Sequence, residues 1–435
     1  MTPVRELRPV DAALRRVLPP QTPQPNVTYR PSMYALSAEG RVWNTLTQQC
    51  VEGRLPETAR AFEGWDDLIR SYMLVPEGKD EVRFYMELSA LMRACLKSNG
   101  YRGYTVLPTL CCNARCVYCY EQGQAQTSMT DETALETARF ILSTHGEEPV
   151  SISWFGGEPL LRPDIPDRIS GELERAGVRY RADMITNGSL VTPDIIRRMT
   201  SLWNLREVQV SMDGDRDDYA RRKRYIRGGS EYDDVLRGID GMARAGIHVK
   251  VRCNVDRDNW PGVGAFLRDL SAAVTEKNNV AVYFCPLDEV RTGPDDLALW
   301  TEILKARPMI RAAGFRIADS ILGSGLFRVF HCMADMDRVV IGPDGSLYPC
   351  DHCPPEVRFG DIRQGVTDEQ GRRAFCRTDH VREKCARCPY LPLCTAFDHC
   401  PVKDTHCREL RDMDLKWFVQ QFGPGFSPTD SAGPC

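Results

Sequence analysis

Three cysteines lie within eight residues of this 435-residue chain, as Cys112, Cys116 and Cys119 in the run Cys-Asn-Ala-Arg-Cys-Val-Tyr-Cys. The C-x3-C-x2-C spacing directly follows a predicted strand, so one loop carries all three thiols. A four-iron cubane takes four ligands, and three cysteines leave one iron open to a ligand that is not protein. Catalytic zinc sites likewise combine three protein ligands with one position open to a ligand that is not protein. A zinc knuckle is the alternative, but it needs a fourth Cys or His nearby. Cys111 is the nearest candidate, but two adjacent residues such as Cys111 and Cys112 rarely bind the same metal ion.

Cysteines are unusually frequent in this chain, which has 18 of them and a net charge of −4. They concentrate in residues 111–119 and 332–407. The N-terminus has no signal-peptide pattern and no run of about 18 apolar residues occurs, so we expect a cytoplasmic protein outside the membrane. Disulfides are not expected in that compartment, which leaves metal or iron–sulfur ligation. The interspersed charges give no reason to expect nucleic acid as a partner.

The middle of the chain, residues 104–325, alternates between predicted strands and amphipathic helices. Strands are predicted at 104–109, 150–155, 180–186, 206–212, 247–254 and 280–285. Helices are predicted at 131–143, 165–176, 192–202, 232–245, 260–274 and 295–313. Six such units predict an α/β fold, a partial (β/α)6 barrel of the TIM type.

Two flanking segments lack this rhythm. Residues 1–103 predict a small α+β module, with a proline-rich arm free of helix over 1–28, a strand–turn–strand at 33–46 and helices near 62–73 and 80–97. Residues 326–435 are rich in Cys, Pro, Asp and Arg and poor in apolar runs. We therefore expect bound metal to supply the folding free energy of this last domain.

Small polar clusters follow the predicted strands, at the end where parallel barrels carry functional residues. Glycines there let a ligand approach the backbone, hydroxyl and carboxylate oxygens can accept hydrogen bonds, and a guanidinium suits a planar anion. The candidate binding residues are Tyr118, Gly156, Gly157, Glu158, Asn187, Ser211, Asp213, Arg222 and Arg224.

The cysteine spacing, with the aromatic Tyr118 before the last cysteine, resembles the signature of the radical S-adenosylmethionine (SAM) enzymes. The resemblance implies that SAM chelates the open iron and that one electron, from a flavodoxin or ferredoxin-type donor, cleaves it to a 5′-deoxyadenosyl radical. It implies that Gly156 and Gly157 bind the SAM amino group near Glu158, and that Tyr118 lies beside the adenine. Ser211 and Asp213 suit the ribose hydroxyls or the SAM carboxylate, and either Arg222 or Arg224 clamps that carboxylate.

The C-terminal cysteines resemble the SPASM domain, which holds two auxiliary [4Fe–4S] clusters in radical SAM peptide and protein maturases. The resemblance assigns the first auxiliary cluster to Cys332, Cys350 and Cys400. It assigns the second to Cys385, Cys388, Cys394 and Cys407. Two points stay open: Asp398 stands where the family has its sixth cysteine, and Cys353 is a candidate extra ligand for the first cluster.

Asp351 directly follows Cys350. In anaerobic sulfatase-maturating enzymes, an aspartate at this place serves as the base that deprotonates the substrate, and burial beside a cluster would tune its pKa for that work. The alternative is an exposed loop carboxylate.

The combined resemblance implies a peptide maturase that installs an oxidative crosslink, such as a thioether, in a ribosomally synthesised precursor peptide. The N-terminal module would bind the precursor's leader, with residues 33–46 presenting a strand edge to it. One alternative is formylglycine formation on a sulfatase. The others are a non-catalytic iron–sulfur electron carrier or sensor, and a zinc-binding structural protein.

Overall fold

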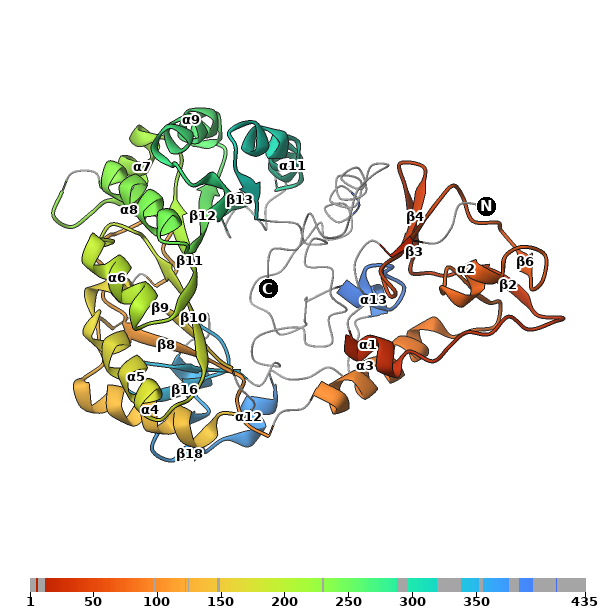
Figure 1. Ribbon diagram of the computed structural model, residues 1–435, viewed down its shortest axis with the longest axis horizontal. Coiled ribbons are helices and arrows are strands. Elements are labelled where there is room, and N and C mark those ends of the chain that lie inside the picture. Colours follow the sequence, from red (N-terminus) through yellow and green to blue (C-terminus); the bar gives the residue numbers. More distant parts are fainter. Residues whose placement is uncertain are drawn as a thin grey trace.

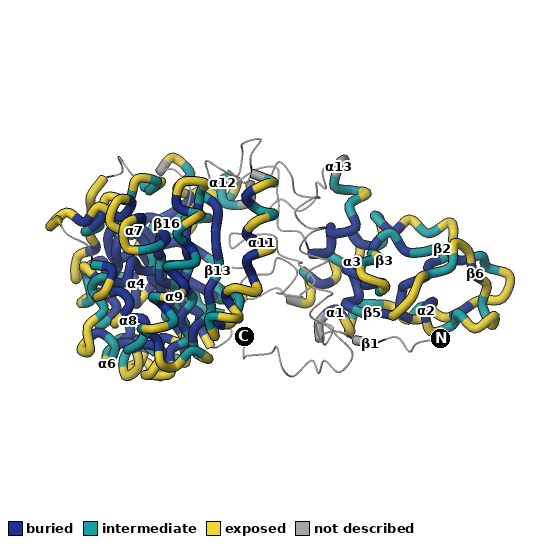
Figure 2. Tube along the Cα trace, turned by 90° about the horizontal axis from the view of Figure 1, so that it is seen from above, coloured by how far each residue is buried: buried dark blue, intermediate teal, exposed yellow. Residues whose placement is uncertain are grey.

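The computed structural model describes residues 5–6, 12–96, 99–121, 123, 125–146, 149–228, 231–287, 296–318, 338–351, 355–374, 383–393 and 412. Figure 1 shows a larger lobe built on a curved sheet and a smaller lobe formed by the N-terminal segment. Each lobe has its own buried interior (Figure 2).

Six parallel strands form the centre of the larger lobe and pair in chain order. They are β8 (Gly103–Thr109), β9 (Val150–Gly156), β10 (Tyr180–Thr186), β11 (Leu205–Met212), β12 (His248–Val255) and β13 (Val280–Pro286). The longer helices between them are α4 (Asp131–Thr144), α5 (Asp164–Arg175), α6 (Pro193–Ser201), α8 (Tyr232–Arg244) and α9 (Val263–Ala273), and the shorter α7 (Arg216–Lys223) precedes α8. After β13 come α11 (Asp296–Ala312) and the short β14 (Arg316–Ile317). The predicted partial barrel is confirmed.

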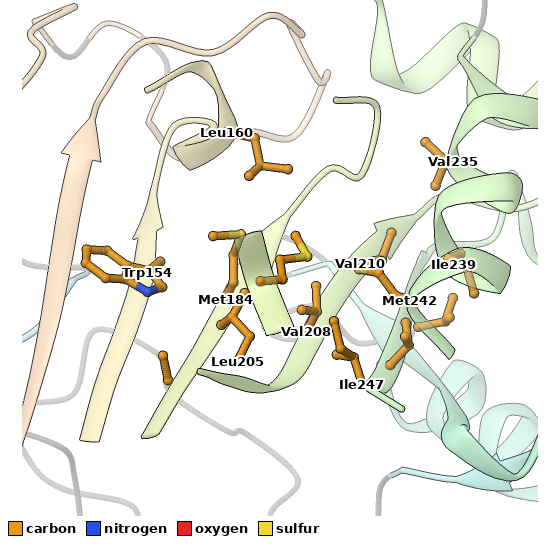
Figure 3. Close-up of a cluster of buried hydrophobic side chains, with 14 of the residues drawn as sticks. Trp154, Leu160, Met184, Leu205, Val208, Val210, Val235, Ile239, Met242 and Ile247 are labelled. Carbon is orange, nitrogen blue, oxygen red and sulfur yellow. The ribbon is translucent and has the colours of Figure 1, made fainter. Parts of the chain in front are cut away.

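The two faces of this sheet differ in character because successive side chains of a strand point to opposite sides. On the outer face, Trp154, Met184 and Val208 are fully or almost fully buried, and Ile239 and Met242 of α8 belong to the same apolar cluster (Figure 3). The helices α4, α5, α6, α8 and α9 lie on this convex side (Figure 1).

Polar side chains occupy the alternate positions, on the inner face, where most are half-buried. Lys250 pairs with Glu207 at 2.6 Å, and the hydroxyl of Tyr283 donates to Gln209 at 2.8 Å. A hydrogen bond also joins Ser153 to Asp183. The concave side of the barrel is therefore a polar wall.

The sheet continues beyond the expected domain boundary at residue 326. Strand β15 (Arg338–Ile341) pairs parallel with β8, and β16 (Ser346–Tyr348), β17 (Gly360–Asp361) and β18 (Gly365–Val366) follow as antiparallel strands. Val339, Ile341 and Leu347 are fully buried in the barrel's apolar cluster. The described residues of 338–366 therefore share the apolar core of the barrel, in addition to the metal that we expect to stabilise this domain.

Two short helices, α12 (Glu369–Ala374) and α13 (Glu383–Ala386), are described further along, with a 3-10 turn at Leu391–Leu393. The candidate ligands Cys332, Cys353, Cys394, Asp398, Cys400 and Cys407 lie outside the described residues. No helix in the described part of the chain is both long and apolar enough to cross a membrane.

The N-terminal module contains two small sheets. One has the order β1 (Arg5–Glu6), β5 (Gln49–Glu52), β4 (Arg41–Asn44), β3 (Ala35–Ala38); the other has the order β6 (Ala59–Arg60), β2 (Thr28–Pro31), β7 (Leu74–Pro76). The helices are α1 (Ala12–Val17), α2 (Asp66–Arg70) and α3 (Glu81–Leu96). The hairpin expected at 33–46 forms as β3 and β4, and its turn residues Glu39 and Gly40 both have positive φ.

The expected helix-free arm is a wrong prediction for the described part of residues 1–28. Helix α1 forms before the prolines begin, so Pro19 and Pro20 follow it and do not interrupt it. Leu14 of α1 is fully buried, and the proline stretch is held by Tyr72, whose hydroxyl donates to the Pro19 carbonyl at 2.6 Å. Gln21 also donates to the carbonyls of Ile69 and Leu74.

Candidate active site

The three-cysteine loop leaves the carboxyl end of β8, and its thiols are partly buried. Burial, and to a smaller extent the charges of Glu158, Cys116 and Cys119, raises the pKa of Cys112 to about 11. The three thiols are therefore close enough to oppose one another's ionisation. A metal cluster, which takes cysteines as thiolates, removes that penalty. Among the described residues, no three Cys, His, Asp or Glu side chains converge closely enough to hold a single metal ion.

Cys111 turns away from this group, since its thiol accepts a hydrogen bond from the Ser128 hydroxyl at 3.8 Å. Its carbonyl instead faces the loop after β9. A Cβ added at Gly157 would lie 2.4 Å from that carbonyl oxygen, so no side chain fits there. Gly156 has a φ of +107°, and a Cβ added there would likewise lie 2.4 Å from the Thr109 carbonyl oxygen. These glycines let the cysteine loop and the end of β9 pack backbone against backbone.

A segment after β11 holds the loop from the other side. The amide of Val117 donates to the Arg222 carbonyl at 3.1 Å, and that of Arg115 donates to the Lys223 carbonyl at 3.1 Å. The amide of Ile226 donates back to the Asn113 carbonyl at 2.9 Å. This pairing sets the end of helix α7 (Arg216–Lys223) against the cysteine loop.

A buried polar cluster made of Tyr118, Ser211, Asp213, Lys223 and Asn254 lies at the ends of β11 and β12. The Tyr118 hydroxyl donates to Asp213, with 2.6 and 2.7 Å to its two carboxylate oxygens, and lies 3.2 Å from Lys223 Nζ. Lys223 donates to Ser211 at 2.8 Å and pairs with Asp213 at 3.5 Å. Asn254 donates to Tyr118 at 3.0 Å and to Asp213 at 3.1 Å.

Electrostatics keep this cluster charged although it is almost inaccessible to solvent, with Asp213 0% and Lys223 2% exposed. Burial alone would lower the pKa of Lys223, but the charge of Asp213, followed by those of Tyr118 and Cys116, outweighs it and raises the pKa well above its usual value. Burial, and next the charge of Asp213, raises the pKa of Tyr118 well above its usual value. We conclude that Lys223 is a cation and Tyr118 a neutral hydrogen-bond donor at neutral pH.

The two candidate arginines have different environments. Arg222 is buried, its Nη1 donates to Asp256 at 2.7 Å, and its guanidinium lies 5.6 Å from the centre of the Tyr118 ring. Its Nε and Nη2 are buried and have no hydrogen-bond partner in the structure. Arg224 is exposed, adopts a positive φ of 49° and donates to the Arg221 carbonyl. Buried donors without partners are costly unless a ligand accepts from them, which favours Arg222 over Arg224 as the anion-binding residue.

Glu158 lies fully buried between the ends of β9 and β10. One carboxylate oxygen accepts from the Leu160 amide at 3.0 Å and the Thr186 hydroxyl at 2.7 Å, and the other accepts from the Asn187 amide at 2.8 Å. Burial raises the pKa of Glu158, and these three donors oppose the shift. Both oxygens are thus engaged within the protein, and Glu158 acts as a brace between two strand ends.

Asn187 links that brace to the cysteine loop. The nitrogen of its side-chain amide donates to the side-chain oxygen of Asn113 at 2.8 Å and lies 3.9 Å from the Cys112 sulfur. The structure therefore brings together the cysteine loop, Gly156, Gly157, Glu158, Asn187, Ser211, Asp213 and Arg222, and leaves Arg224 at the surface.

Sequence reasoning missed Lys223 and the connecting role of Asn259, whose side chain donates to the backbone carbonyls of Asp213 (2.8 Å) and Asn254 (2.9 Å). Lys223 belongs to the basic run Arg221–Arg224, which is typical of a solvated surface. The eight residues of α7 contain too few apolar positions to predict an amphipathic helix. The one available signal was the position of the run shortly after a strand that ends in Ser211 and Asp213.

Cys350 and Asp351 lie just beyond β16, with their sulfur and carboxylate oxygen 3.3 Å apart. Burial raises the pKa of Tyr120, and charges on Glu121, Asp351, Cys119 and Cys350 raise it further. Cys350 and Asp351 are therefore within electrostatic reach of the end of the cysteine loop.

The parallel partial barrel thus carries a three-thiol loop after its first strand and two buried, unpartnered donors of Arg222 beside that loop, a combination suited to a metal cluster and an anionic ligand. Residues 106–262 match the family model of the Radical SAM superfamily. Enzymes of this superfamily use SAM and a [4Fe–4S] cluster for radical-based redox chemistry. The site fits both groups: one loop supplies three thiols, and Arg222 offers two unpartnered donors to the SAM carboxylate.

The first three curated relatives each match about a third of this chain. Fe-coproporphyrin III synthase of Methanosarcina barkeri is 29% identical over 151 residues, 34% of this chain and 35% of that protein. AdoMet-dependent heme synthase of Nitratidesulfovibrio vulgaris is 26% identical over 319 residues, 66% of this chain and 84% of that protein. The alignments with the first three curated relatives span 35%, 51% and 41% of their lengths.

Two solved structures are similar in fold. anSMEcpe with bound AdoMet and Cp18Cys peptide has a TM-score of 0.58 at 16% identity, covering 73% of this chain and 97% of that one. Streptococcus suis SuiB bound to precursor peptide SuiA has a TM-score of 0.50 at 13% identity, covering 86% of this chain and 94% of that one. At these identities the likeness concerns the fold.

Proposed function

We propose that this chain is a cytoplasmic radical SAM peptide maturase that installs an oxidative crosslink in a ribosomally synthesised precursor peptide. Cys112, Cys116 and Cys119 would hold the SAM-binding cluster. The observation that carries the proposal is the pair of unpartnered Arg222 donors, buried beside a loop of three thiols. When bound, the cluster supplies the electron that cleaves SAM to methionine and a 5′-deoxyadenosyl radical.

The contacts divide the candidate residues into those that face SAM and those that position them. Arg222 would bind the SAM carboxylate, and the backbone at Gly157 would approach the amino group. The Tyr118 ring would lie beside the adenine, held by its hydrogen bond to Asp213. Asp213, Glu158 and Asn187 already bond within the protein, so they would act by orienting Tyr118 and the cysteine loop.

Incubation of the anaerobically reconstituted protein with dithionite and SAM tests the first half of this proposal. We expect 5′-deoxyadenosine, and roughly twelve irons per chain for three four-iron clusters. An iron-containing protein that forms no 5′-deoxyadenosine would instead be an electron carrier or sensor. A colourless protein without iron or sulfide would be a zinc protein.

Seven C-terminal cysteines would hold two auxiliary [4Fe–4S] clusters: Cys332, Cys350 and Cys400 the first, and Cys385, Cys388, Cys394 and Cys407 the second. The proximity of Cys350 to the end of the three-cysteine loop supports a first auxiliary cluster near the SAM site. A cluster in that place would accept the electron that an oxidative crosslink releases from the substrate. A flavodoxin or ferredoxin-type protein would supply the electron for SAM cleavage.

A peptide substrate suits the inner wall of the barrel. Glu207, Gln209, Lys250 and Tyr283 present donors and acceptors there, along three neighbouring strands. The fold resemblance to SuiB, solved with its precursor peptide SuiA, supports the same substrate class. The natural test substrate is a precursor peptide, to be sought among the reading frames that neighbour the gene. Coexpression followed by mass measurement should show a loss of two hydrogens per crosslink.

Strand β3 would receive the leader. It is the terminal strand of its sheet, pairs only with β4 among the described residues, and thereby leaves one edge for an added strand. Addition of the leader segment of the precursor, once that peptide is identified, should slow hydrogen exchange of the amides at 35–38, because new backbone hydrogen bonds protect them. The inner strand β4 should change little. Equal exchange at 35–38 with and without tightly bound leader would exclude this docking mode.

Asp351→Asn should retain 5′-deoxyadenosine formation and lose crosslinked product by at least about a hundredfold, the contribution of a positioned general base. Asparagine keeps the shape but cannot take a proton. Product is measured by mass spectrometry in single-turnover reactions, with Glu356→Gln as the control because Glu356 is an exposed carboxylate nearby. Full product formation by Asp351→Asn would rule out the base role.

The second candidate function is formylglycine formation on a sulfatase, which the position of Asp351 after Cys350 also favours. It gives a new aldehyde on the substrate, whereas crosslinking gives a two-hydrogen loss without one. Mass measurement after coexpression with each substrate separates the two.

A further inference from the structure

The described residues from Cys385 to Leu393 pack against the N-terminal module, although more than 300 residues separate the two segments. Leu391 is 5% exposed and belongs to a core cluster whose other members all come from the module. They are Leu14, Tyr34, Leu46, Tyr85, Leu88 and Met92. Cys385 packs against the same cluster. The apolar core of the N-terminal module is therefore completed by a piece of the C-terminal cysteine domain.

One polar contact fixes the register of this packing. The hydroxyl of Thr45, which is fully buried, donates to the carbonyl of Pro389 at 2.5 Å, and the Tyr34 carbonyl inside the module is a second, more distant acceptor at 3.4 Å. Pro389 directly follows Cys388. Asn44 holds the loop that carries Thr45: its side chain accepts from the Leu46 and Thr47 amides at 2.9 and 3.1 Å and donates to the Tyr72 carbonyl at 2.8 Å. These contacts of Asn44 all lie within the N-terminal module.

The two cysteines themselves lie in a short turn. The Cys388 amide donates to the Cys385 carbonyl at 2.9 Å, and the Leu391 amide donates to the Cys388 carbonyl at 3.1 Å. The turn thus leads directly into the residues that the module buries. Any displacement of Pro389 or Leu391 moves Cys388 with it.

We propose that the N-terminal module positions Cys385 and Cys388 for the second auxiliary cluster, with Thr45 as a positioning residue. The inference rests on the proposed function, which assigns that cluster to these cysteines. It adds that the metal centre is built from both ends of the chain. Since metal-binding free energy is also folding free energy, occupation of the cluster should in turn stabilise the module.

Thr45→Val in the full-length chain tests the proposal, because valine keeps the volume and removes the donor. The matched control is Thr47→Val: Thr47 is equally buried, lies in the same loop, and donates to the Ser71 carbonyl at 3.3 Å, inside the module. Both proteins are reconstituted anaerobically, and iron, sulfide and the electron paramagnetic resonance of the reduced clusters are measured. We expect Thr45→Val to lose up to about a third of the iron, or to shift one cluster signal, and Thr47→Val to match the wild type.

Equal iron content and equal spectra in the two variants would overturn the proposal, and so would equal losses, which indicate general destabilisation. A wild type with about four irons would contradict the auxiliary clusters of the proposed function instead. If Thr45→Val does not fold, Cys388→Ala supplies the reciprocal measurement. Hydrogen exchange should then quicken in 41–52 and 81–96 and stay unchanged in the barrel strands; unchanged exchange in the module would refute the coupling.

Discussion

Cys116→Ala should abolish 5′-deoxyadenosine formation and lower the iron content by about four atoms per chain. The middle cysteine of the loop has no neighbour able to replace it, because the thiol of Cys111 faces Ser128. Two remaining thiols cannot hold a cubane against the repulsion and desolvation that raise their pKa values. Iron assay and chromatographic detection of 5′-deoxyadenosine under dithionite measure the two losses.

Cys111→Ala is the matched control, since it removes a thiol one position outside the triad and leaves the carbonyl that faces Gly157. It should keep wild-type iron and SAM cleavage. Retention of SAM cleavage by Cys116→Ala, or its loss in Cys111→Ala, would contradict the assignment of the three ligands.

Lys223→Met should destabilise the barrel by about 3–5 kcal/mol, because it leaves the fully buried carboxylate of Asp213 without its cation. SAM cleavage should fall as well, since Lys223 anchors both Tyr118 and Ser211. The lysine pKa is raised above its usual 10.5, so its stabilising effect is complete below that pH and is lost only as pH rises through the higher folded-state value. The loss on mutation should therefore be constant between about pH 6 and 9. Denaturant unfolding at several pH values measures it.

Two comparisons make this prediction specific. Lys250→Met breaks a pair in which both side chains are about 40% exposed, and such pairs contribute at most about 1 kcal/mol. Lys223→Met combined with Asp213→Asn removes the lone charge and should regain most of the stability without regaining SAM cleavage. If the single variant Lys223→Met is as stable as Lys250→Met, the buried ion pair has no structural role.

The local sequence pattern was sufficient to predict the strands of the barrel. All six strands from β8 to β13 were predicted to within one residue at each end, because each is a short segment with buried apolar positions that alternates with an amphipathic helix along the chain. The cysteine loop and the polar residues after β9, β10 and β11 were placed at one edge of the sheet for the same reason. Because the strands are parallel and pair in sequence order, their carboxyl ends all lie at the same end of the barrel.

Contacts between distant segments were not predictable in this way. Helix α7 has no apolar stripe, and its Lys223 becomes a buried cation only because the cysteine loop pairs with residues 222–226. The choice between Arg222 and Arg224 depended on the same pairing, which buries one and leaves the other at the surface. Strand β15 was assigned to a separate domain because its edge pairing with β8 leaves no local signal.

The sequence by itself determined the order of strands and helices and the chemistry of the thiol loop, since strand and helix periodicity and ligand spacing are local properties. Only the tertiary structure decided which charges are buried together around Tyr118 and that Leu391 completes the core of the N-terminal module. Burial and pairing across 100 to 350 residues depend on where the folded chain returns, and no local window of sequence records that.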